Sequence, residues 1–452
     1  MTETAGPSSA ELAAIIEDRT AEEIAMSIAR HVRQAPLSAD TPLPTVRSLA
    51  AELGVSASTV SDAWRILRAR GVIDTDRRRG TTVRLDRTAA GGRAWHVPVE
   101  PGALAVDLST GTPDPALLPD LGGALLQATD DHQVTSYLDR PVLPALEVEL
   151  RRRWPFDPGR ITLLDGAQDA LDRLIDATVN FGDRVIVETP TFPPVLDMLE
   201  LAGAEVIGVP VDPEGPVVDA VEAALDRGPT VAIAQPRAHN PSGVAFSETR
   251  AAQLAARFAD HDVLVIEDDH SGMVAGAPLH SLGVHRPDRT VHVHSFSKSH
   301  GPDLRLAAVG GPSEIIDAVV RRRQLGPSWT SRLLQRVLLG LLTDPAAEAA
   351  VRDAEQTYLV RRRALVDALN RAGVTVDTNG SGLNLWIPVD DERDAVVALA
   401  AGGIGAAPGG PFQVGDSGGD HIRLTISRVT DPDDLAEAVA KAARRGGGTA
   451  GR

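Results

Sequence analysis

The sequence of 452 residues contains no cysteine, which excludes disulfide scaffolds, thiolate nucleophiles and cysteine-ligated metal sites. No apolar run approaches the roughly 18 residues that a membrane span needs, and the N-terminal residues lack the basic and apolar regions of a signal peptide. Aromatic residues make up only 3% of the chain, yet 43% of its residues are hydrophobic, which is enough for sizeable cores. Together with the length, these features predict a cytoplasmic protein of more than one domain with no membrane association.

Lysine is also nearly absent, because Lys298 and Lys441 are the only lysines among 45 basic residues. Arginine supplies all the other positive charges. A guanidinium stays protonated, whereas an amine can lose its proton and form an imine. Each retained lysine is therefore a candidate for covalent chemistry.

The charge of the chain is unevenly distributed. A net charge of −17 argues against a protein that coats nucleic acid with its whole surface, but residues 45–84 hold eight arginines and only four acidic residues. The apolar spacing of this N-terminal region predicts helices at residues 10–34, 45–53 and 58–70 and short strands at 72–76 and 80–85. This order is typical of a winged helix-turn-helix, so we expect a DNA-binding domain at residues 10–85.

A larger α/β region follows the DNA-binding domain. Residues 86–105 are rich in Gly, Ala and Pro and are expected to form a linker. Short apolar strands then alternate with helical stretches, which predicts a mostly parallel sheet with helices on both faces. The strands are expected at residues 185–188, 206–209, 231–234, 263–267 and 291–295. We expect the large domain at residues 106–325 and a smaller α+β lobe at residues 326–445.

The segment around Lys298 carries the sharpest chemical signal. It follows a predicted strand, the position where ligand sites gather in α/β sheets. Its two hydroxyl groups, its lysine and its arginine suit an aldehyde cofactor that carries a phosphate. Lys298 would form a Schiff base, while Ser295, Ser297 and Arg305 would hold the phosphate.

Four other motifs allow a cofactor site, and three of them also have an ordinary structural explanation. Gly166 opens a helix and offers either a phosphate cradle or a simple turn. One carboxylate of Glu267–Asp269 is a candidate partner for a protonated pyridine nitrogen, or else a helix cap or surface turn. Asn240 lies either in a plain turn or beside a cofactor oxygen, and Arg423 is a candidate clamp for a substrate carboxylate.

With these motifs in this order, the chain resembles the fold-type I, pyridoxal-phosphate-dependent aminotransferases. Residues 43–73 resemble the winged helix-turn-helix of the GntR superfamily, and the combination resembles the MocR-type regulators over nearly the whole chain. The resemblance implies an α/β fold-type I domain, pyridoxal 5′-phosphate as cofactor and a homodimer. It also implies a double-stranded DNA operator and a small amino-group effector as partners.

The resemblance also implies roles for individual residues. Lys298 would bind the cofactor covalently, Asp268 would face its ring nitrogen, Asn240 its phenolic oxygen, and Phe192 would stack on the ring. The residues implied at the phosphate are Gly166, Ala167, Gln168, Ser295, Ser297, Arg305 and, from the neighbouring subunit, Tyr137. Arg423 would bind the effector's carboxylate. The residues implied at DNA are Arg47, Ser58, Thr59, Ser61, Arg65, Arg77, Arg78 and Arg79.

Three positions depart from the family pattern. His270 stands where the family usually has a tyrosine that hydrogen-bonds the cofactor, and we expect its imidazole to act as the donor there. Asn384 stands where histidine is frequent, and Ala57 where an arginine is common after the turn of the helix-turn-helix.

Three functions are compatible with these residues. The first is a transcriptional regulator whose aminotransferase-like domain senses a ligand. The second is a working aminotransferase whose N-terminal domain is an interaction module, and the third is a relic that has lost its cofactor. The arginines of the N-terminal domain favour the regulator, because an enzyme alone has no need of them.

Overall fold

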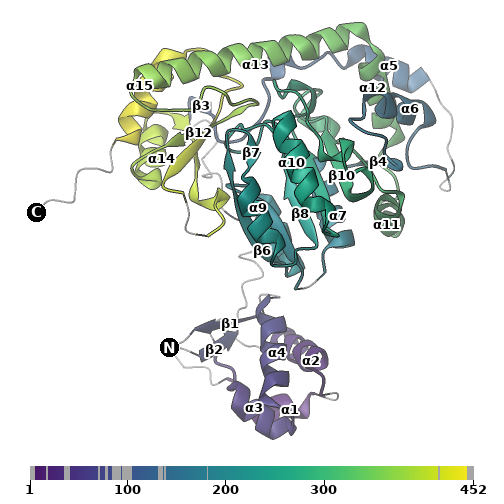
Figure 1. Cartoon of the computed structure of the whole chain (residues 1–452), viewed down its shortest axis with the longest axis vertical. Helices are drawn as coiled ribbons and strands as arrows, with labels where there is room; N and C mark the ends of the chain where they lie inside the picture. The colour runs from purple at the N-terminus through teal and green to yellow at the C-terminus, as the bar shows by residue number, and fades with distance from the viewer. Residues whose placement is uncertain are drawn as a thin grey trace, which may run out of the picture. The chain divides into compact units, whose positions relative to one another are not determined.

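The chain forms two compact units, residues 1–92 and 93–452, which are described separately (Figure 1). In the computed structural model the described residues are 6–16, 19–34, 41–69, 72–76, 80–83, 93, 104–130, 136, 139–180, 182–415 and 418–444.

The N-terminal unit contains four helices and a two-stranded antiparallel sheet in its described part. These elements are α1 (Ser9–Ala14), α2 (Ala21–Gln34), α3 (Val46–Leu53), α4 (Ala57–Ala69), β1 (Ile73–Asp76) and β2 (Gly80–Val83). The side chain of Thr45 caps the start of α3, and Gly54 ends it in the left-handed conformation with φ 66°. The predicted helix-turn-helix and its two-stranded wing are confirmed.

The prediction of one helix over residues 10–34 is wrong. Helix α1 ends before Ile15, and α2 starts after Thr20, whose hydroxyl accepts a hydrogen bond from the backbone N–H of Glu23 at 3.3 Å. Leu12 and Ile24 nevertheless bury in the same core, so the apolar spacing continues across the break. The N-cap threonine marks the interruption, because its side chain satisfies a backbone donor that a continuous helix would satisfy itself.

An eight-stranded sheet forms the centre of the second unit. Its order is β4 (Arg160–Leu164), β11 (Ala307–Gly311), β10 (Thr290–Ser295), β9 (Leu264–Asp269), β8 (Val231–Ala234), β5 (Arg184–Thr189), β6 (Glu205–Asp212) and β7 (Gly215–Pro216). Strands β11 and β7 are antiparallel to their neighbours, and the pairings from β10 to β6 are all parallel. The expected mostly parallel sheet is confirmed.

Helices cover both faces of this sheet. On one face lie α7 (Ala167–Thr178), α8 (Pro193–Ala202) and α11 (Ser313–Gln324). On the other lie α9 (Val218–Leu225), α10 (Glu248–Ala259), α5 (Gly122–Asp130), α6 (Pro144–Arg153) and α12 (Arg332–Thr343). Because both faces are covered, every residue from Leu264 to Asp269 of β9 is buried.

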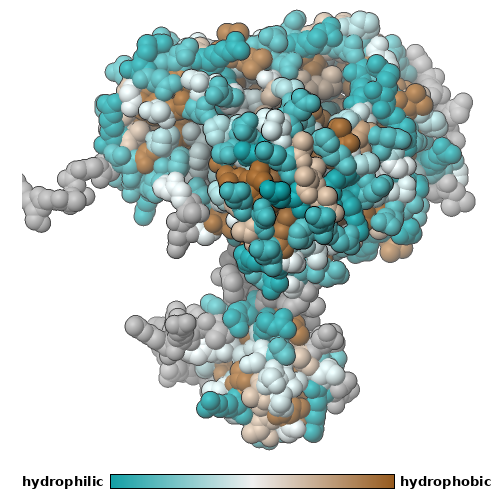
Figure 2. Space-filling view, viewed as in Figure 1, coloured by the Kyte–Doolittle hydropathy of each residue, from teal (hydrophilic) through white to brown (hydrophobic). Residues whose placement is uncertain are grey.

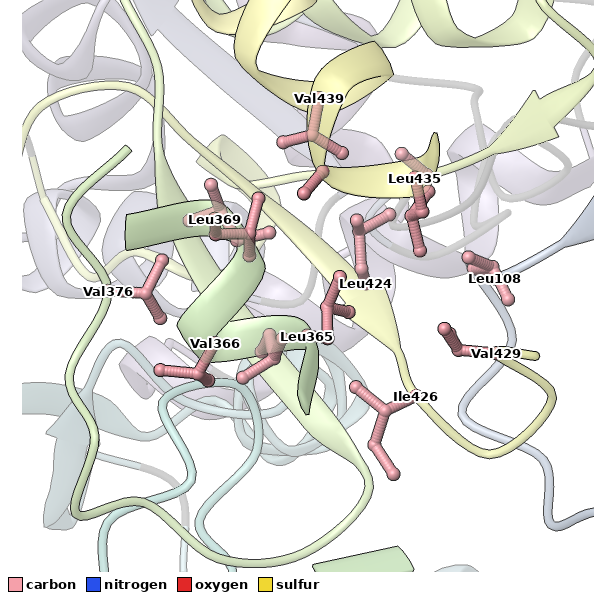
Figure 3. Packing of buried hydrophobic residues seen from close by; sticks show 14 of the residues in the cluster. Leu108, Leu365, Val366, Leu369, Val376, Leu424, Ile426, Val429, Leu435 and Val439 are labelled. Atoms are coloured by element: carbon pink, nitrogen blue, oxygen red, sulfur yellow. The ribbon is translucent and has the colours of Figure 1, made fainter. Parts of the chain in front are cut away.

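The C-terminal lobe has a three-stranded antiparallel sheet of β12 (Asn384–Pro388), β15 (His421–Thr425) and β14 (Ala407–Pro408). Its helices are α13 (Pro345–Arg371), α14 (Glu392–Ala401) and α15 (Pro432–Ala443). Strand β3 (Val106–Asp107) pairs with β13 (Ile404–Gly405), and the next residue, Leu108, lies in the lobe's core with Leu424 and Val429 (Figure 3). The segment after the expected linker is thus fastened to the C-terminal lobe.

Most side chains on the visible face of the second unit are hydrophilic, with hydrophobic residues in small separate patches (Figure 2). None of the helices within the described residues combines the length and the apolar character that crossing a membrane requires.

Candidate functional site

The predicted site residues follow strands that end at one edge of the large sheet. Strands β4, β5, β8, β9 and β10 run in the same direction, so their carboxyl ends lie together. Open α/β sheets bind ligands at this edge. Gly166, Phe192, Asn240 and Lys298 come shortly after four of these strands, and Asp268 lies near the end of the fifth.

The three carboxylates that end β9 have different partners. Glu267 accepts hydrogen bonds from the Ser281 hydroxyl at 2.7 Å and the Leu282 N–H at 2.6 Å. Asp269 accepts two bonds from the Arg237 guanidinium, at 2.9 and 2.8 Å. The Oδ1 atom of Asp268, by contrast, is buried and has no hydrogen-bond partner among the described residues. Asp268 is therefore the carboxylate that is left to bind a ligand.

A histidine pair next to Asp269 also has metal-ligand chemistry. One ligand atom each of Asp269, His292 and His294 lies within 4.8 Å of the others. Arg237, however, already donates to both oxygens of Asp269. Since this guanidinium supplies the positive charge that the buried carboxylate needs, the cluster is explained as a buried ion-pair network.

Asp268 is buried, with 2% of its surface exposed. Burial raises the pKa of Asp268 to about 6, although a hydrogen bond from Gln235 at 2.8 Å lowers it. A buried carboxylate with one bare oxygen is costly unless a cationic or N–H group pairs with it. A protonated pyridine nitrogen is such a group.

Lys298 lies close enough to Asp268 and Arg423 for both charges to affect its ionisation. Burial lowers the pKa of the Lys298 ammonium to about 8, and Arg423 acts in the same direction while Asp268 opposes it. Its Nζ donates to the carbonyl oxygen of Gly111 at 2.5 Å. A lowered pKa favours the neutral amine, which is the nucleophilic form.

Arg423 lies on β15 with 1% of its surface exposed. It donates to the Oδ1 atom of Asn240 at 3.2 Å and to the carbonyl oxygen of Ser109, and its guanidinium lies 5.2 Å from the ring centroid of Phe412. Burial lowers the pKa of Arg423 to about 10, which leaves it charged at neutral pH. The structure thus brings the predicted clamp and the predicted Asn240 into direct contact.

Four of the predicted phosphate residues, Gly166, Ala167, Gln168 and Arg305, lie at the start of α7. Gly166 precedes this helix with φ 100°, and a Cβ atom there would lie 3.2 Å from the Arg305 guanidinium carbon. Arg305 is exposed, and its side chain makes no hydrogen bond or ion pair with any described residue. Ala167 and Gln168 supply N–H groups of the first helical turn, and such groups favour the binding of an anion.

Ser295 and Ser297 also lie together, because the Ser297 N–H donates to the Ser295 hydroxyl at 3.3 Å. Phe192 is half-buried before the first residue of α8. His270 follows β9, and its Nδ1 atom is buried without a hydrogen-bond partner in the described part of the chain. Burial lowers the pKa of His270 to about 4, so its imidazole is neutral at neutral pH.

The predicted DNA-contacting residues that are described lie on α3 and α4. Ser58, Ser61 and Arg65 are exposed on α4, and Thr59 is half-buried at its start. Arg47 on α3 is exposed as well. The predictions for Tyr137 and for Arg77, Arg78 and Arg79 fall outside the described residues.

Sequence reasoning missed three residues that contact the predicted site. Gln235 bonds both Asp268 and Asn240, while the carbonyl oxygens of Ser109 and Gly111 accept from Arg423 and Lys298. Backbone carbonyls carry no signal in residue type. Gln235 directly follows β8, and its position at the end of a parallel strand was the only available signal.

Comparison with protein families divides the chain in the same way. Residues 20–83 match the bacterial regulatory proteins of the gntR family, whose members bind DNA. Residues 105–441 match the aminotransferase class I and II family.

The vitamin B6 salvage pathway transcriptional repressor PtsJ of Salmonella typhimurium is 35% identical over 93% of this chain and 97% of its own length. The pyridoxine biosynthesis transcriptional regulator PdxR of Corynebacterium glutamicum is 26% identical over 91% and 96%. Among solved structures, kynurenine aminotransferase of Pyrococcus horikoshii superposes with a TM-score of 0.69, at 22% identity over 75% of this chain and 90% of its own. The chain therefore belongs to the MocR-type transcriptional regulators, which join a GntR-family DNA-binding domain to an aminotransferase class I and II domain.

Proposed function

We propose that this regulator binds pyridoxal 5′-phosphate at Lys298, senses a small amino-group ligand at the same site, and changes its affinity for a DNA operator in response. The names of two relatives, which regulate vitamin B6 salvage and pyridoxine biosynthesis, support genes of vitamin B6 supply as the targets.

The residues present fit the cofactor. Asp268 offers a buried, bare oxygen to the ring nitrogen, and Arg305 with the start of α7 offers a cradle to the phosphate. When bound, pyridoxal phosphate supplies an aldehyde that condenses with amines and a pyridine ring that withdraws electrons. Lys298 is the amine with the lowered pKa beside Asp268.

One observation carries the sensing function: two positive charges of the site, Lys298 and Arg423, bind the same short segment. Lys298 donates to the Gly111 carbonyl and Arg423 to the Ser109 carbonyl. A lysine that is covalently occupied no longer donates as an ammonium, and a ligand carboxylate competes with Ser109 for Arg423. Ligands at this site therefore act directly on residues 109–111.

Segment 104–112 begins at the C-terminal end of the expected linker and continues into the large domain. Its residue Leu108 is buried in the core of the C-terminal lobe, and the Gly111 N–H donates to the Thr425 hydroxyl at 2.9 Å (Figure 3). A change in the site thus reaches the chain that leads back to the DNA-binding unit. This path needs no other element to carry the response.

A homodimer is the proposed assembly. Leu125 and Leu126 on α5 are 43% and 71% exposed, and Leu333 on the neighbouring α12 is 45% exposed. Exposed apolar patches mark interaction surfaces. Light scattering combined with size-exclusion chromatography tests this assembly, with Leu126→Asp expected to shift the protein toward the monomer.

Transamination is the second candidate function. The lowered pKa of Lys298 and the bare oxygen of Asp268 favour it, because an aminotransferase needs a nucleophilic amine and a partner for the ring nitrogen. The test is incubation of the cofactor-loaded protein with single amino acids and detection of the 2-oxo acid products.

The experiment for the proposed function uses the two lysines as a matched pair. Borohydride reduction of the protein loaded with pyridoxal phosphate, followed by peptide mapping, is expected to find the label on Lys298. The Lys298→Ala variant should lose it, and Lys441→Ala should keep it. DNA fragments selected by the protein from its own genome then serve as the operator, and their affinity is measured with and without pyridoxal phosphate. A label on Lys441, or wild-type DNA binding that is affected neither by pyridoxal phosphate alone nor by pyridoxal phosphate together with amino acids, would overturn the proposal.

A further inference from the structure

Gln235 links Asp268 and Asn240, the two residues that the family resemblance assigns to the ring nitrogen and the phenolic oxygen of the cofactor. It follows β8 directly, and only 4% of its surface is exposed. Its Nε2 atom donates to the Oδ2 atom of Asp268 at 2.8 Å, and its Oε1 atom accepts from the backbone N–H of Asn240 at 2.7 Å. One amide group thus contacts both residues.

The partners fix which way the amide points. The backbone N–H of Asn240 can only donate, so it faces Oε1, and an ionised Asp268 can only accept, so it faces Nε2. Because Oδ2 of Asp268 is engaged in this way, its Oδ1 atom is the oxygen left without a partner. The same hydrogen bond lowers the pKa of Asp268, against the effect of burial, and so favours the carboxylate.

A third hydrogen bond anchors the backbone of Gln235. Its N–H donates to the Oε2 atom of Glu188 at 2.8 Å, and Glu188 is itself buried at the end of β5. Burial raises the pKa of Glu188 well above its ordinary value. His239 lies near the same oxygen, with its Nε2 atom 3.4 Å from Oε2. Gln235 is thus held between neighbouring strands.

We propose that Gln235 is a positioning residue, which orients Asp268 toward the ring nitrogen of pyridoxal phosphate and holds Asn240 toward its phenolic oxygen. The inference rests on the proposed function, because it assumes that the cofactor binds at this site. It assigns the alignment of both ring contacts to one side chain, which acts through Asp268 and Asn240.

Two substitutions separate the two hydrogen bonds of the side chain. Gln235→Met keeps the length of the side chain and removes both bonds. Gln235→Glu keeps an acceptor for Asn240 but places a second carboxyl against Asp268, so the pair must share a proton. Gln335→Met is the matched control, because Gln335 is a fully buried glutamine whose amide bonds Leu143 N–H, Pro141 O and Thr330 O.

The measurements are the dissociation constant of pyridoxal phosphate and the absorbance of the bound cofactor between pH 5 and 9. We expect Gln235→Met to bind the cofactor about tenfold more weakly at every pH, as expected for the loss of a hydrogen bond to a charged group. We expect Gln235→Glu to bind pyridoxal phosphate as weakly as Gln235→Met near pH 8. Its affinity should recover toward pH 5, where the new carboxyl is protonated and donates to Asp268. Gln335→Met should keep the wild-type affinity and pH profile.

The outcomes distinguish this inference from the proposed function. If both Gln235 variants bind pyridoxal phosphate within about twofold of the wild type and with its pH profile, Gln235 does not position the ring contacts and the inference alone is wrong. If the two variants lose affinity equally at all pH values, as a general packing defect predicts, the inference is also wrong. Absence of covalent cofactor in the wild type would overturn the proposed function, and this inference with it.

Discussion

Consecutive residues of one strand have different chemical environments in this protein. Glu267 and Asp269 point to the face of the sheet where they bond with Ser281 and Arg237, while Asp268 points to the opposite face. Because side chains alternate between the two faces of a strand, two hydrogen-bonded carboxylates lie on one face and the carboxylate with an unpaired oxygen lies on the other. That unpaired oxygen makes the protein without cofactor less stable than it would otherwise be.

We expect Asp268→Asn to stabilise the cofactor-free protein and to weaken cofactor binding. Burial raises the pKa of Asp268 from 3.8 to about 6, so the folded state binds this proton more tightly than the unfolded state. The contribution of Asp268 to stability therefore falls as the pH rises from about 4 to about 6 and stays low above that range. At pH 7 the amide should raise the free energy of unfolding of the second unit by about 1–3 kcal/mol.

Thermal unfolding of the cofactor-free variants at pH 5 and pH 7 checks this sign. The exposed Asp353→Asn on α13 serves as the control and should change neither melting temperature. Lower stability of Asp268→Asn at pH 7 would mean that its carboxylate is paired in the folded protein.

Residue types indicated several members of the candidate site, and the roles of these residues stay predictions. Lys298 stood out because lysine is so rare in this chain, and the structure places it near Asp268 and Arg423. Gln235 could not be recognised, because its partner Asp268 lies 33 residues away and a glutamine after a strand has many ordinary roles. The contact between Arg423 and Ser109 is to a backbone atom, for which residue type gives no signal.

At the scale of elements, the start of α7 combines three features that favour an anion. The N–H groups of its first turn have no acceptor within the helix. Gly166 has a positive φ and no side chain, so an anion can approach these N–H groups. The Arg305 guanidinium lies against that glycine. Side chains at position 166 would fill the space next to the guanidinium.

We expect Gly166→Ala to weaken the binding of pyridoxal phosphate by at least about tenfold, while binding of pyridoxal, which has no phosphate, changes much less. The reason is that a Cβ atom would lie 3.2 Å from Arg305 and would strain a backbone at φ 100°. Dissociation constants for both aldehydes measure the effect. Gly228→Ala, at φ 69° with no atom within 4 Å of the added Cβ, is the control. Equal losses for the two aldehydes would show that α7 does not hold the phosphate.

Helix α4 is the element that we expect to contact DNA. Arg65 is exposed on it, and its ion pair with Asp62, at 3.4 Å, has both side chains more than half exposed. Such a pair contributes little to stability and leaves the arginine available to a phosphate. We expect Arg65→Ala to weaken operator binding and to reduce the slope of log affinity against log salt by about one. Arg321→Ala, exposed on α11, should change neither quantity, and an unchanged slope for Arg65→Ala would place this residue away from the phosphates.

Sequence patterns located most elements because their physical causes are local. Strands β5 and β8 contain continuous apolar runs at residues 185–187 and 231–234, as expected of strands buried on both faces. Helix α3 ends at Leu53, as expected, because Gly54 follows it in the left-handed conformation. The break between α1 and α2 was missed because both helices bury their apolar residues in one core, so hydrophobic spacing alone does not distinguish one helix from two.

At the scale of the whole molecule, the proposed function depends on transmitting a signal between two units that fold around separate cores. Residues 20–83 carry the DNA-binding family match and residues 105–441 the aminotransferase match. A tenfold change in operator affinity needs only about 1.4 kcal/mol of coupling between them. The two hydrogen bonds from Lys298 and Arg423 to segment 104–112 contribute a free energy of this magnitude.

We expect Arg423→Ala to abolish the response of DNA binding to amino acids. The guanidinium is the group that a ligand carboxylate would draw away from Ser109, so without it the ligand has no differential contact with that segment. The measurement is the ratio of operator dissociation constants for the cofactor-loaded protein with and without each member of an amino-acid panel. That ratio should fall to about one. Arg393→Ala, exposed on α14 of the same lobe, should keep the wild-type ratio. If Arg423→Ala keeps the ratio, the effector is sensed elsewhere.

The carbonyl groups of Ser109 and Gly111 are two residues apart and are held by different cations. If the hydrogen bond from Lys298 is lost, Arg423 still holds segment 104–112. If the hydrogen bond from Arg423 is lost, Lys298 still holds it. The proposed regulator would therefore work as a coincidence detector. Cofactor and amino acid together would produce a change in transcription greater than the sum of their separate effects. Transcription of the target gene would then respond most strongly when vitamin B6 and the amino-group ligand are both available.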